Sequence, residues 1–437
     1  MTQPVTLAII GAGKRGQAYA AYAALHPELA RVVAIAEPRQ ALRESMAREF
    51  GVPAAACFHS YEELARQPQL AAAALICTQD RSHRDAVEHI APLGYAMLLE
   101  KPMAPGLADC EAIVACVKAH RSLFAVCHVL LYTELTTQLT ALMRAGVIGE
   151  LVTVQHHEPV AWWHQAHSFV RGNWRNTAES SCMLLAKSCH DIDWLRHIVG
   201  KKCLRVASFG SLHHFKASAC PPGATARCWD CPVETQCPYS AKRIYHTHFG
   251  RDNVTDYIND VITAGINTRD VVEQALKTGP YGRCVYACDN DVVDNQTVML
   301  QYEDAVTASF MMTAFTPTLQ RTTRLCGTRG YIETDFAKIK TFDFLTETES
   351  VHDTRLTAAS ATAAAGHGGG DYFLMKAFVH AVATGDTSGL FSGPDATLES
   401  HRTVFAAEHS RLTGTMVDLA APAATASMPI GSLTGRQ

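Results

Sequence analysis

Apolar and polar residues alternate along the first third of the chain in a way that predicts buried strands separated by helices. Short, continuous apolar runs, typical of strands buried on both faces, lie at 5–10, 32–36, 72–76, 96–99 and 123–126. Helical periodicity lies between several of these runs, at 39–50, 83–90 and 109–119. This order predicts an α/β domain over residues 1–127, with a mostly parallel sheet covered by helices on both faces.

The pattern changes after residue 127, where strand-like runs follow one another closely. These runs lie at 151–156, 292–302, 306–315, 322–326 and 331–334. Helical periodicity lies at 133–145, 183–200, 371–383 and 394–412. We therefore expect residues 128–420 to form an α+β domain with an open, mostly antiparallel sheet. Residues 421–437 are mostly small or polar and predict a flexible tail.

Composition narrows the class of protein. Hydrophobic residues make up 48% of the chain, charged residues make up 18%, and the net charge is −4. This balance gives no reason to expect nucleic acid or a membrane surface as a partner. No apolar run approaches the roughly 20 residues of a membrane span. The chain enters a strand at once and holds 15 cysteines, so we expect reduced thiols and a cytoplasmic location.

The turn after the first apolar run carries the motif G-A-G-K-R-G at residues 11–16. Gly11 allows a tight turn, Gly13 allows backbone to approach a pyrophosphate, and Gly16 allows the helix to pack on the strand. Glu37 follows the second strand, about 20 residues past the last glycine, where such folds bind ribose hydroxyls. A carboxylate there would repel a 2′-phosphate, so NAD is favoured over NADP, although the nearby Arg39 weakens this preference.

Further cofactor contacts are expected at the carboxyl ends of later strands, where ligands bind in doubly wound Rossmann sheets. In addition to the three glycines and Glu37, we expect these residues to contact the cofactor: Lys14, Arg15, Thr78, Gln79, His83 and Glu100.

Several motifs occur together in a fixed order. They are G-A-G-K-R-G, then C-T-Q-D at 77–80, E-K-P at 100–102, K-S-C-H-D-I-D at 187–193, H-G-G-G-D at 367–371 and S-H-R at 400–402. On these motifs the chain resembles the glucose–fructose oxidoreductase / inositol dehydrogenase (Gfo/Idh/MocA) family, over roughly 5–200 and 287–415. The resemblance implies an N-terminal Rossmann domain and a second domain whose open sheet commonly forms the interface of a homodimer or homotetramer. It also implies NAD(P)-dependent chemistry on a ring hydroxyl of a small carbohydrate or cyclitol.

Such chemistry needs a group that binds or deprotonates the hydroxyl. In similar proteins the lysine of E-K-P has this role, here Lys101, and His190 is a second candidate. Many relatives carry an aspartate where this chain has Ala186, so Lys187 is a third candidate. The sequence leaves open which of the three is the base.

The stretch 156–175 combines aromatic, histidine and arginine side chains that suit a polyol pocket, although a packed loop would look the same. Together with Lys101 and His190, the expected substrate contacts are Trp163, Arg171, Trp174, Asp193 and His367.

The four cysteines Cys220, Cys228, Cys231 and Cys237 have the spacing C-x7-C-x2-C-x5-C. This spacing fits a closed, structural zinc site in an insertion at about 205–285. An iron–sulfur cluster and free thiols are the alternatives.

The leading hypothesis is an NAD-dependent dehydrogenase of a sugar, sugar derivative or cyclitol. The alternative is a redox-neutral NAD-dependent glycoside hydrolase, which oxidises its substrate transiently and breaks the glycosidic bond by elimination. A non-catalytic regulator with the same fold is disfavoured by the presence of both Lys101 and His190.

Overall fold

The computed structural model describes residues 3–250, 253–263, 265–354 and 367–420. The tail predicted at 421–437 and most of the Ala/Gly-rich segment that precedes His367 lie outside the described residues. Within the described part, no helix is long and apolar enough to cross a membrane.

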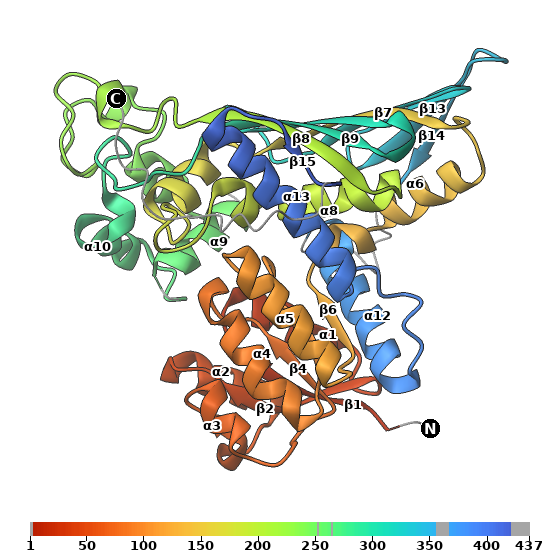
Figure 1. The fold of residues 1–437 in the computed structure, drawn as a ribbon. Helices are drawn as coiled ribbons and strands as arrows, with labels where there is room; N and C mark the ends of the chain where they lie inside the picture. The colour runs from red at the N-terminus through yellow and green to blue at the C-terminus, as the bar shows by residue number, and fades with distance from the viewer. Residues whose placement is uncertain (1–2, 251–252, 264, 355–366, 421–437) are drawn as a thin grey trace.

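The first domain is built on a six-stranded parallel sheet of order β3-β2-β1-β4-β5-β6. Its strands are β1 (Val5–Ile10), β2 (Ala30–Ala36), β3 (Cys57–Phe58), β4 (Ala73–Ile76), β5 (Ala96–Leu99) and β6 (Phe124–Val126). Its helices are α1 (Lys14–Leu25), α2 (Gln40–Phe50), α3 (Tyr61–Ala65), α4 (His83–Ile90) and α5 (Leu107–Ala119). Helices cover both faces, which explains why β4 and β5 are apolar throughout and β1 nearly so. The carboxyl ends of these strands share one edge, which faces the second domain (Figure 1).

The second domain is built on a nine-stranded sheet of order β14-β13-β12-β11-β7-β10-β9-β8-β15. Only β7 (Leu151–Pro159) and β10 (Thr307–Thr313) pair in parallel within this sheet. The remaining strands are β8 (Cys203–Ser211), β9 (Asn295–Tyr302), β11 (Thr322–Gly327), β12 (Gly330–Thr334), β13 (Lys338–Asp343), β14 (Thr348–Asp353) and β15 (Val417–Asp418). The predicted fold class, a Rossmann domain followed by a mostly antiparallel α+β domain, is confirmed.

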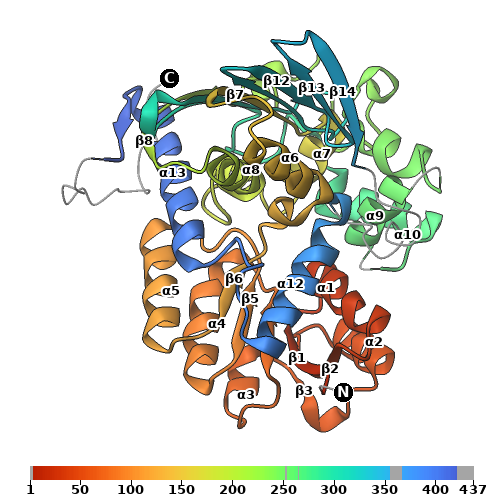
Figure 2. The ribbon, with the colours of Figure 1, turned by 90° about the vertical axis from the view of Figure 1, so that its right-hand side faces the viewer.

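One face of the large sheet is covered by helices and the other is bare (Figures 1 and 2). The covering helices are α6 (Glu134–Arg144), α8 (Met183–Val199) and α13 (Pro394–Thr413). Alternation along β9 follows from this arrangement: Val298 and Leu300 are buried, whereas Met299 is 48% exposed. Helix α12 (Gly370–Thr384) returns to pack on α1 of the first domain (Figure 2).

Residues 212–294 form an insertion between the neighbouring strands β8 and β9. It contains α9 (Asn253–Ile262) and α10 (Arg269–Thr278) and has its own small hydrophobic cluster, which includes Phe215, Tyr245 and Leu276. Residues 205–211 were expected inside the insertion but belong to β8. The strands β8, β13 and β14 were not among those predicted from the sequence.

Candidate functional site

The glycine-rich turn between β1 and α1 is tightly constrained. Gly11 has a φ of +94°, and a Cβ atom there would lie 2.5 Å from the carbonyl oxygen of Cys77. A Cβ atom on Gly16 would lie 2.0 Å from the carbonyl oxygen of Gly11. At Gly13 the nearest atom to such a Cβ is the Arg39 side chain, at 3.4 Å, so backbone there is open to a ligand. The turn therefore fits a pyrophosphate at the start of α1.

Glu37 lies at the end of β2, where the sequence places it, and is 1% exposed. It accepts hydrogen bonds from the backbone N–H of Ala12 (2.7 Å) and from Arg39 Nε (2.6 Å). Burial alone would raise the pKa of Glu37, but the hydrogen bonds from Arg39 and Ala12 outweigh burial and lower it. An ionised carboxylate at this point suits ribose hydroxyls and disfavours a 2′-phosphate.

The two basic residues of the motif contact protein groups. Lys14 Nζ forms a 3.0 Å ion pair with Asp260 on α9 of the insertion. Arg15 donates to Glu100 (2.5 Å) and to both oxygens of Asp371 (2.6 and 3.1 Å). Arg15 therefore joins α1 to the E-K-P turn and to α12.

The loop after β4 adds one group suited to a ligand. The hydroxyl oxygen Oγ1 of Thr78 is buried and has no hydrogen-bond partner in the part of the chain that the structure describes. Gln79 beside it is exposed. His83 is fully buried, and its Nδ1 donates to the carbonyl oxygen of Pro102 at 2.9 Å. Together with the glycine cradle and Glu37, the unpartnered Thr78 hydroxyl makes this edge of the sheet a good fit for NAD.

Glu100 anchors the turn that carries Lys101. Its carboxylate accepts from Arg15, from the Tyr19 hydroxyl (2.8 Å) and from the backbone N–H of Lys101 (2.6 Å). Burial would raise the pKa of Glu100, but the charges of Arg15 and Lys101 outweigh burial and lower it. Both carboxylate oxygens are therefore used within the protein.

Lys101 and His190 come from different domains and meet at their junction. Lys101 Nζ donates to the backbone carbonyl oxygen of Ala186 at 2.8 Å, and Ala186 precedes His190 by one turn of α8. The Ala186 side chain cannot replace the aspartate of many relatives, yet its carbonyl group binds the lysine. His190 is 4% exposed, and burial, followed by the Lys101 charge, holds its pKa well below its ordinary value.

Two further histidine rings surround His190. The His128 ring lies edge-on at 5.6 Å, and the His367 ring lies at 5.9 Å, between ring centroids. His367 Nδ1 also contacts Asp371 at 3.3 Å, which places the H-G-G-G-D segment beside the junction. His190 Nδ1 has no hydrogen-bond partner among the described residues. Asp193 contacts Arg196 (3.1 Å) and approaches His128 (3.9 Å), so it lies behind the junction.

Lys187 lies one turn before Asp191 on α8 and is ion-paired. Its Nζ lies 3.0 Å from Glu158, a fully buried residue near the end of β7. Arg321 also contacts Glu158 (2.7 Å) and Asp191 (2.6 Å). Lys187 is therefore balanced by a carboxylate.

The 156–175 stretch is divided between two regions. His164 lies near the junction, where burial and the charge of Lys187 hold its pKa well below its ordinary value, and the Trp163 ring packs on it at 5.4 Å. Arg171 is buried and points into the insertion, where it donates to the carbonyl oxygens of Arg283 (2.8 Å) and Tyr239 (2.7 Å). Trp174 is 37% exposed. Of these three expected substrate contacts, Trp163 is the one whose ring packs on His164, a residue that senses the charges of Lys187 and Lys101.

The cysteine prediction needs correction. Among residues 3–250, 253–263, 265–354 and 367–420, no group of three or more His, Cys, Asp or Glu side chains is placed to hold a metal ion. The structure therefore gives no support to a zinc ion held by Cys220, Cys228, Cys231 and Cys237. Cys220 is exposed, and a cysteine from outside the predicted set, Cys284, lies with the other three on one cavity.

Family comparisons agree with this architecture. Residues 5–128 match the NAD-binding Rossmann-fold model of the Gfo/Idh/MocA oxidoreductase family, and residues 141–419 match its C-terminal alpha/beta domain model. The chain belongs to the Gfo/Idh/MocA oxidoreductase family. The resemblance inferred from the sequence motifs is confirmed.

Solved structures of the Gfo/Idh/MocA fold match nearly the whole chain. An aldose-aldose oxidoreductase from Caulobacter crescentus, complexed with glycerol, is 16% identical with a TM-score of 0.66, covering 95% of this chain and 100% of that one. An inositol dehydrogenase homolog from Azotobacter vinelandii, complexed with NADH and myo-inositol, is 16% identical with a TM-score of 0.64, covering 95% and 98%. At this identity the likeness shows the shared fold.

Curated relatives in the family match shorter stretches. A 2,7-anhydro-N-acetylneuraminate hydratase from Escherichia coli is 23% identical over 45% of this chain and 50% of its own length. A trans-1,2-dihydrobenzene-1,2-diol dehydrogenase from Mus musculus is 39% identical over 20% of this chain and 25% of its own length. The chain spans half or less of the length of these relatives.

Sequence reasoning missed Glu158, Arg321 and His128 as neighbours of the candidate site. His128 lies two residues past the end of β6, so its position at the carboxyl edge of the parallel sheet was a usable signal. Glu158 and Arg321 are far apart in sequence, and only the pairing of β7 with β11 brings them together.

Proposed function

We propose that the protein is an NAD-dependent oxidoreductase that transfers a hydride from a ring hydroxyl carbon of a sugar, sugar derivative or cyclitol to nicotinamide. The observation that carries the proposal is the meeting of Lys101 and His190, from two domains, at the carboxyl edge of a sheet suited to NAD. NAD supplies the hydride acceptor when bound. The ionised Glu37 supports NAD over NADP.

The two side chains have complementary abilities. Lys101 donates one hydrogen bond to Ala186 and has further N–H groups to hold the substrate hydroxyl oxygen. His190 has a lowered pKa, so its imidazole is neutral at pH 7 and can accept a proton. We therefore assign the hydroxyl contact to Lys101 and the proton acceptor role to His190. Trp163, whose ring packs on His164, and His367, whose ring lies beside His190, are the proposed substrate contacts.

The test is a substrate panel of cyclitols, aldoses, sugar acids and glycosides, with NADH formation followed by absorbance. Formation of NADH with a ring polyol supports the proposal. Binding of NAD without turnover of any alcohol in the panel would count against it.

A redox-neutral reaction is the second candidate, because a curated relative is a hydratase acting on an anhydro sugar. The same Lys101 and His190 would serve a transient oxidation, followed by elimination and no net change in NAD. Release of an aglycone, or addition of water to an anhydro sugar, without stoichiometric NADH would favour this candidate over a dehydrogenase.

We further propose that the protein acts as a homodimer or homotetramer in the cytoplasm. The bare face of the nine-stranded sheet exposes Phe209 (71%), Met299 (48%) and Met311 (45%) on the three adjacent strands β8, β9 and β10, and neighbouring exposed apolar side chains favour an interface. Multi-angle light scattering on the purified protein tests the assembly. Substitution of Phe209 by lysine is expected to shift it toward a smaller species.

A further inference from the structure

The insertion at residues 212–294 reaches the dinucleotide site of the first domain. Its helix α9 carries Asp260, whose carboxylate lies 3.0 Å from Lys14 Nζ. Lys14 is the first residue of α1 and belongs to the glycine-rich turn that fits a pyrophosphate. The centroid of the Tyr257 ring, also on α9, lies 6.0 Å from the same ammonium group. One face of α9 is therefore held against the start of α1, where anions bind.

Lys14 is the cation of the glycine-rich motif that remains for a phosphate. Arg15, the other cation, is committed to Glu100 and Asp371. An ammonium group carries three N–H donors, so the contact with Asp260 leaves two for a ligand. The Lys14 side chain is 38% exposed and that of Asp260 is 31% exposed, so a ligand can reach the pair from solvent. A pyrophosphate on Lys14 would complete a network of three charged groups, which holds its members more firmly than an isolated exposed pair.

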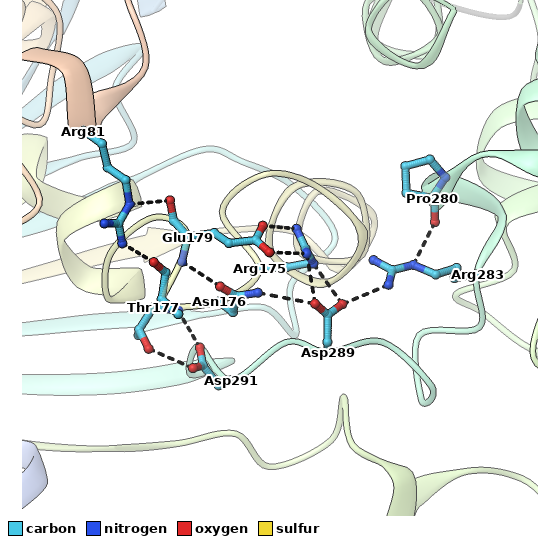
Figure 3. A network of polar contacts seen from close by, with 10 residues as sticks. Arg81, Arg175, Asn176, Thr177, Glu179, Pro280, Arg283, Asp289 and Asp291 are labelled. Atoms are coloured by element: carbon cyan, nitrogen blue, oxygen red, sulfur yellow. Dashed lines mark hydrogen bonds and ion pairs between the residues drawn. The ribbon is translucent and has the colours of Figure 1, made fainter. Parts of the chain in front are cut away.

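A second connection starts from the loop after β4 (Figure 3). Arg81 lies in this loop, three residues after Thr78, and its Nε donates to the backbone oxygen of Glu179 at 2.8 Å. The same guanidinium group also donates to the backbone oxygen of Ala178. Both acceptors belong to residues 175–179 of the second domain, here called the 175–179 loop. The loop after β4 is thus fixed to the second domain.

The 175–179 loop is in turn bound to the end of the insertion (Figure 3). Arg175 donates two hydrogen bonds, both of 2.9 Å, to the carboxylate of Asp289. Asp291 accepts hydrogen bonds from the backbone N–H and from the hydroxyl group of Thr177, at 2.8 Å each. The insertion is therefore connected, through this loop, to the first domain at a second place.

We propose that the insertion is part of the dinucleotide site: Asp260 positions Lys14 for the pyrophosphate, and the 175–179 loop holds the loop after β4 against the cofactor. The two segments so connected, the glycine-rich turn and the loop with Thr78, are those that fit NAD. A bound dinucleotide is held between the first domain and the insertion, and its release requires both connections to loosen. Asp260 and Arg81 act through other groups, so they are positioning residues. This inference rests on the dinucleotide site of the proposed function and adds the control of cofactor release.

The first test measures the release of NADH from the full chain by stopped-flow fluorescence, with excess NAD as competitor. Exposed polar contacts are individually weak, so we expect Asp260→Asn and Arg81→Met each to speed release by about two- to fivefold. The two changes are separate in the structure, so the double variant should multiply the two effects. Asp256→Asn, one turn earlier on α9, is the matched control, because it removes an equal charge from the same helix and leaves the Lys14 pair in place. Release from the double variant at the wild-type rate, or more slowly, would overturn the proposal.

The second test is hydrogen–deuterium exchange on the wild-type protein, which needs no variant to fold. NAD and ADP, which carry a pyrophosphate, should slow exchange in α9, whereas adenosine should leave it unchanged. Equal protection by adenosine and ADP, or faster exchange in α9 with NAD, would overturn the role of Lys14 and Asp260. Failure of the proposed function looks different, because NADH would then not bind, or would not form with any alcohol. Failure of the present inference leaves both NADH binding and NADH formation intact.

Discussion

Replacing Lys101 with methionine removes the ammonium group and keeps an unbranched side chain of similar length. In the structure the ammonium group is fixed by the Ala186 carbonyl oxygen at 2.8 Å, beside His190. A positioned group that binds or moves the reacting proton contributes about 10²- to 10⁴-fold, which is about 3–5 kcal/mol of the barrier. We expect kcat for substrate oxidation to fall by this factor in Lys101→Met.

The binding of NAD should be unchanged in this variant, because the glycine cradle and Glu37 do not contact Lys101. The pKa of His190 should rise toward its ordinary value, since a positive neighbour is lost. As the pH is lowered, the residual activity should therefore begin to fall at a higher pH than in the wild type, because His190 becomes protonated at a higher pH.

The assay is NADH formation at saturating substrate across pH, with NAD affinity measured by calorimetry. Lys118→Met is the matched control, because Lys118 is an exposed lysine on α5 that pairs with the exposed Asp395. A kcat within tenfold of the wild type, with NAD binding intact, would refute the assignment of Lys101.

Three other changes test the surrounding structure. Glu37→Ser removes the carboxylate that faces the expected ribose and frees Arg39. We expect the preference for NAD over NADP to fall by roughly tenfold. Titration with both nucleotides measures the ratio of their affinities, and an unchanged ratio would contradict the prediction. Asp371→Asn weakens two charged hydrogen bonds from Arg15. It should lower the free energy of unfolding by about 3 kcal/mol, which a lower melting temperature would report. An equal melting temperature would show that the other hydrogen bonds of Arg15 are sufficient. His167 has its pKa lowered to about 3 by burial, so the folded state holds it neutral, and its stabilising contribution is present above pH 6.5 and lost as pH falls toward 3. In His167→Asn the free energy of unfolding should therefore fall less steeply with decreasing pH in this range, by the slope that corresponds to about one proton. Urea unfolding at a series of pH values measures this slope, and an unaltered dependence on pH would argue against the prediction.

Local patterns in the sequence were enough to predict the fold class and the ends of several elements. The strand-turn-helix order around Gly11 and the helix from Pro394 both follow from neighbouring residues, and the structure has α13 at Pro394–Thr413. Lys101 and His190 were proposed with the help of the family resemblance, and the structure brings them close together at the domain junction, although their roles stay predictions.

Contacts between distant segments could not be predicted in the same way. Arg15 and Asp371 lie in different halves of the chain, and nothing near either residue in sequence indicates the other. The same holds for Arg171, which an aromatic neighbourhood suggested as a substrate contact, but which the fold turns toward the insertion. Cys284 likewise lies far in sequence from the C-x2-C pair of Cys228 and Cys231, and only the fold brings it to the same cavity.

The position of α12 also bears on how the protein can be divided. This helix lies near the end of the chain, yet its Tyr372 contacts Tyr22 on α1 and His26 just after α1, and its Asp371 contacts Arg15. A fragment that stops at residue 127 would leave this surface of α1 uncovered, although it contains every strand of the parallel sheet. A stable nucleotide-binding fragment would need α12 fused to the first domain through a linker. A chimaera of two homologous proteins would likewise have to take α12 and the first domain from the same parent.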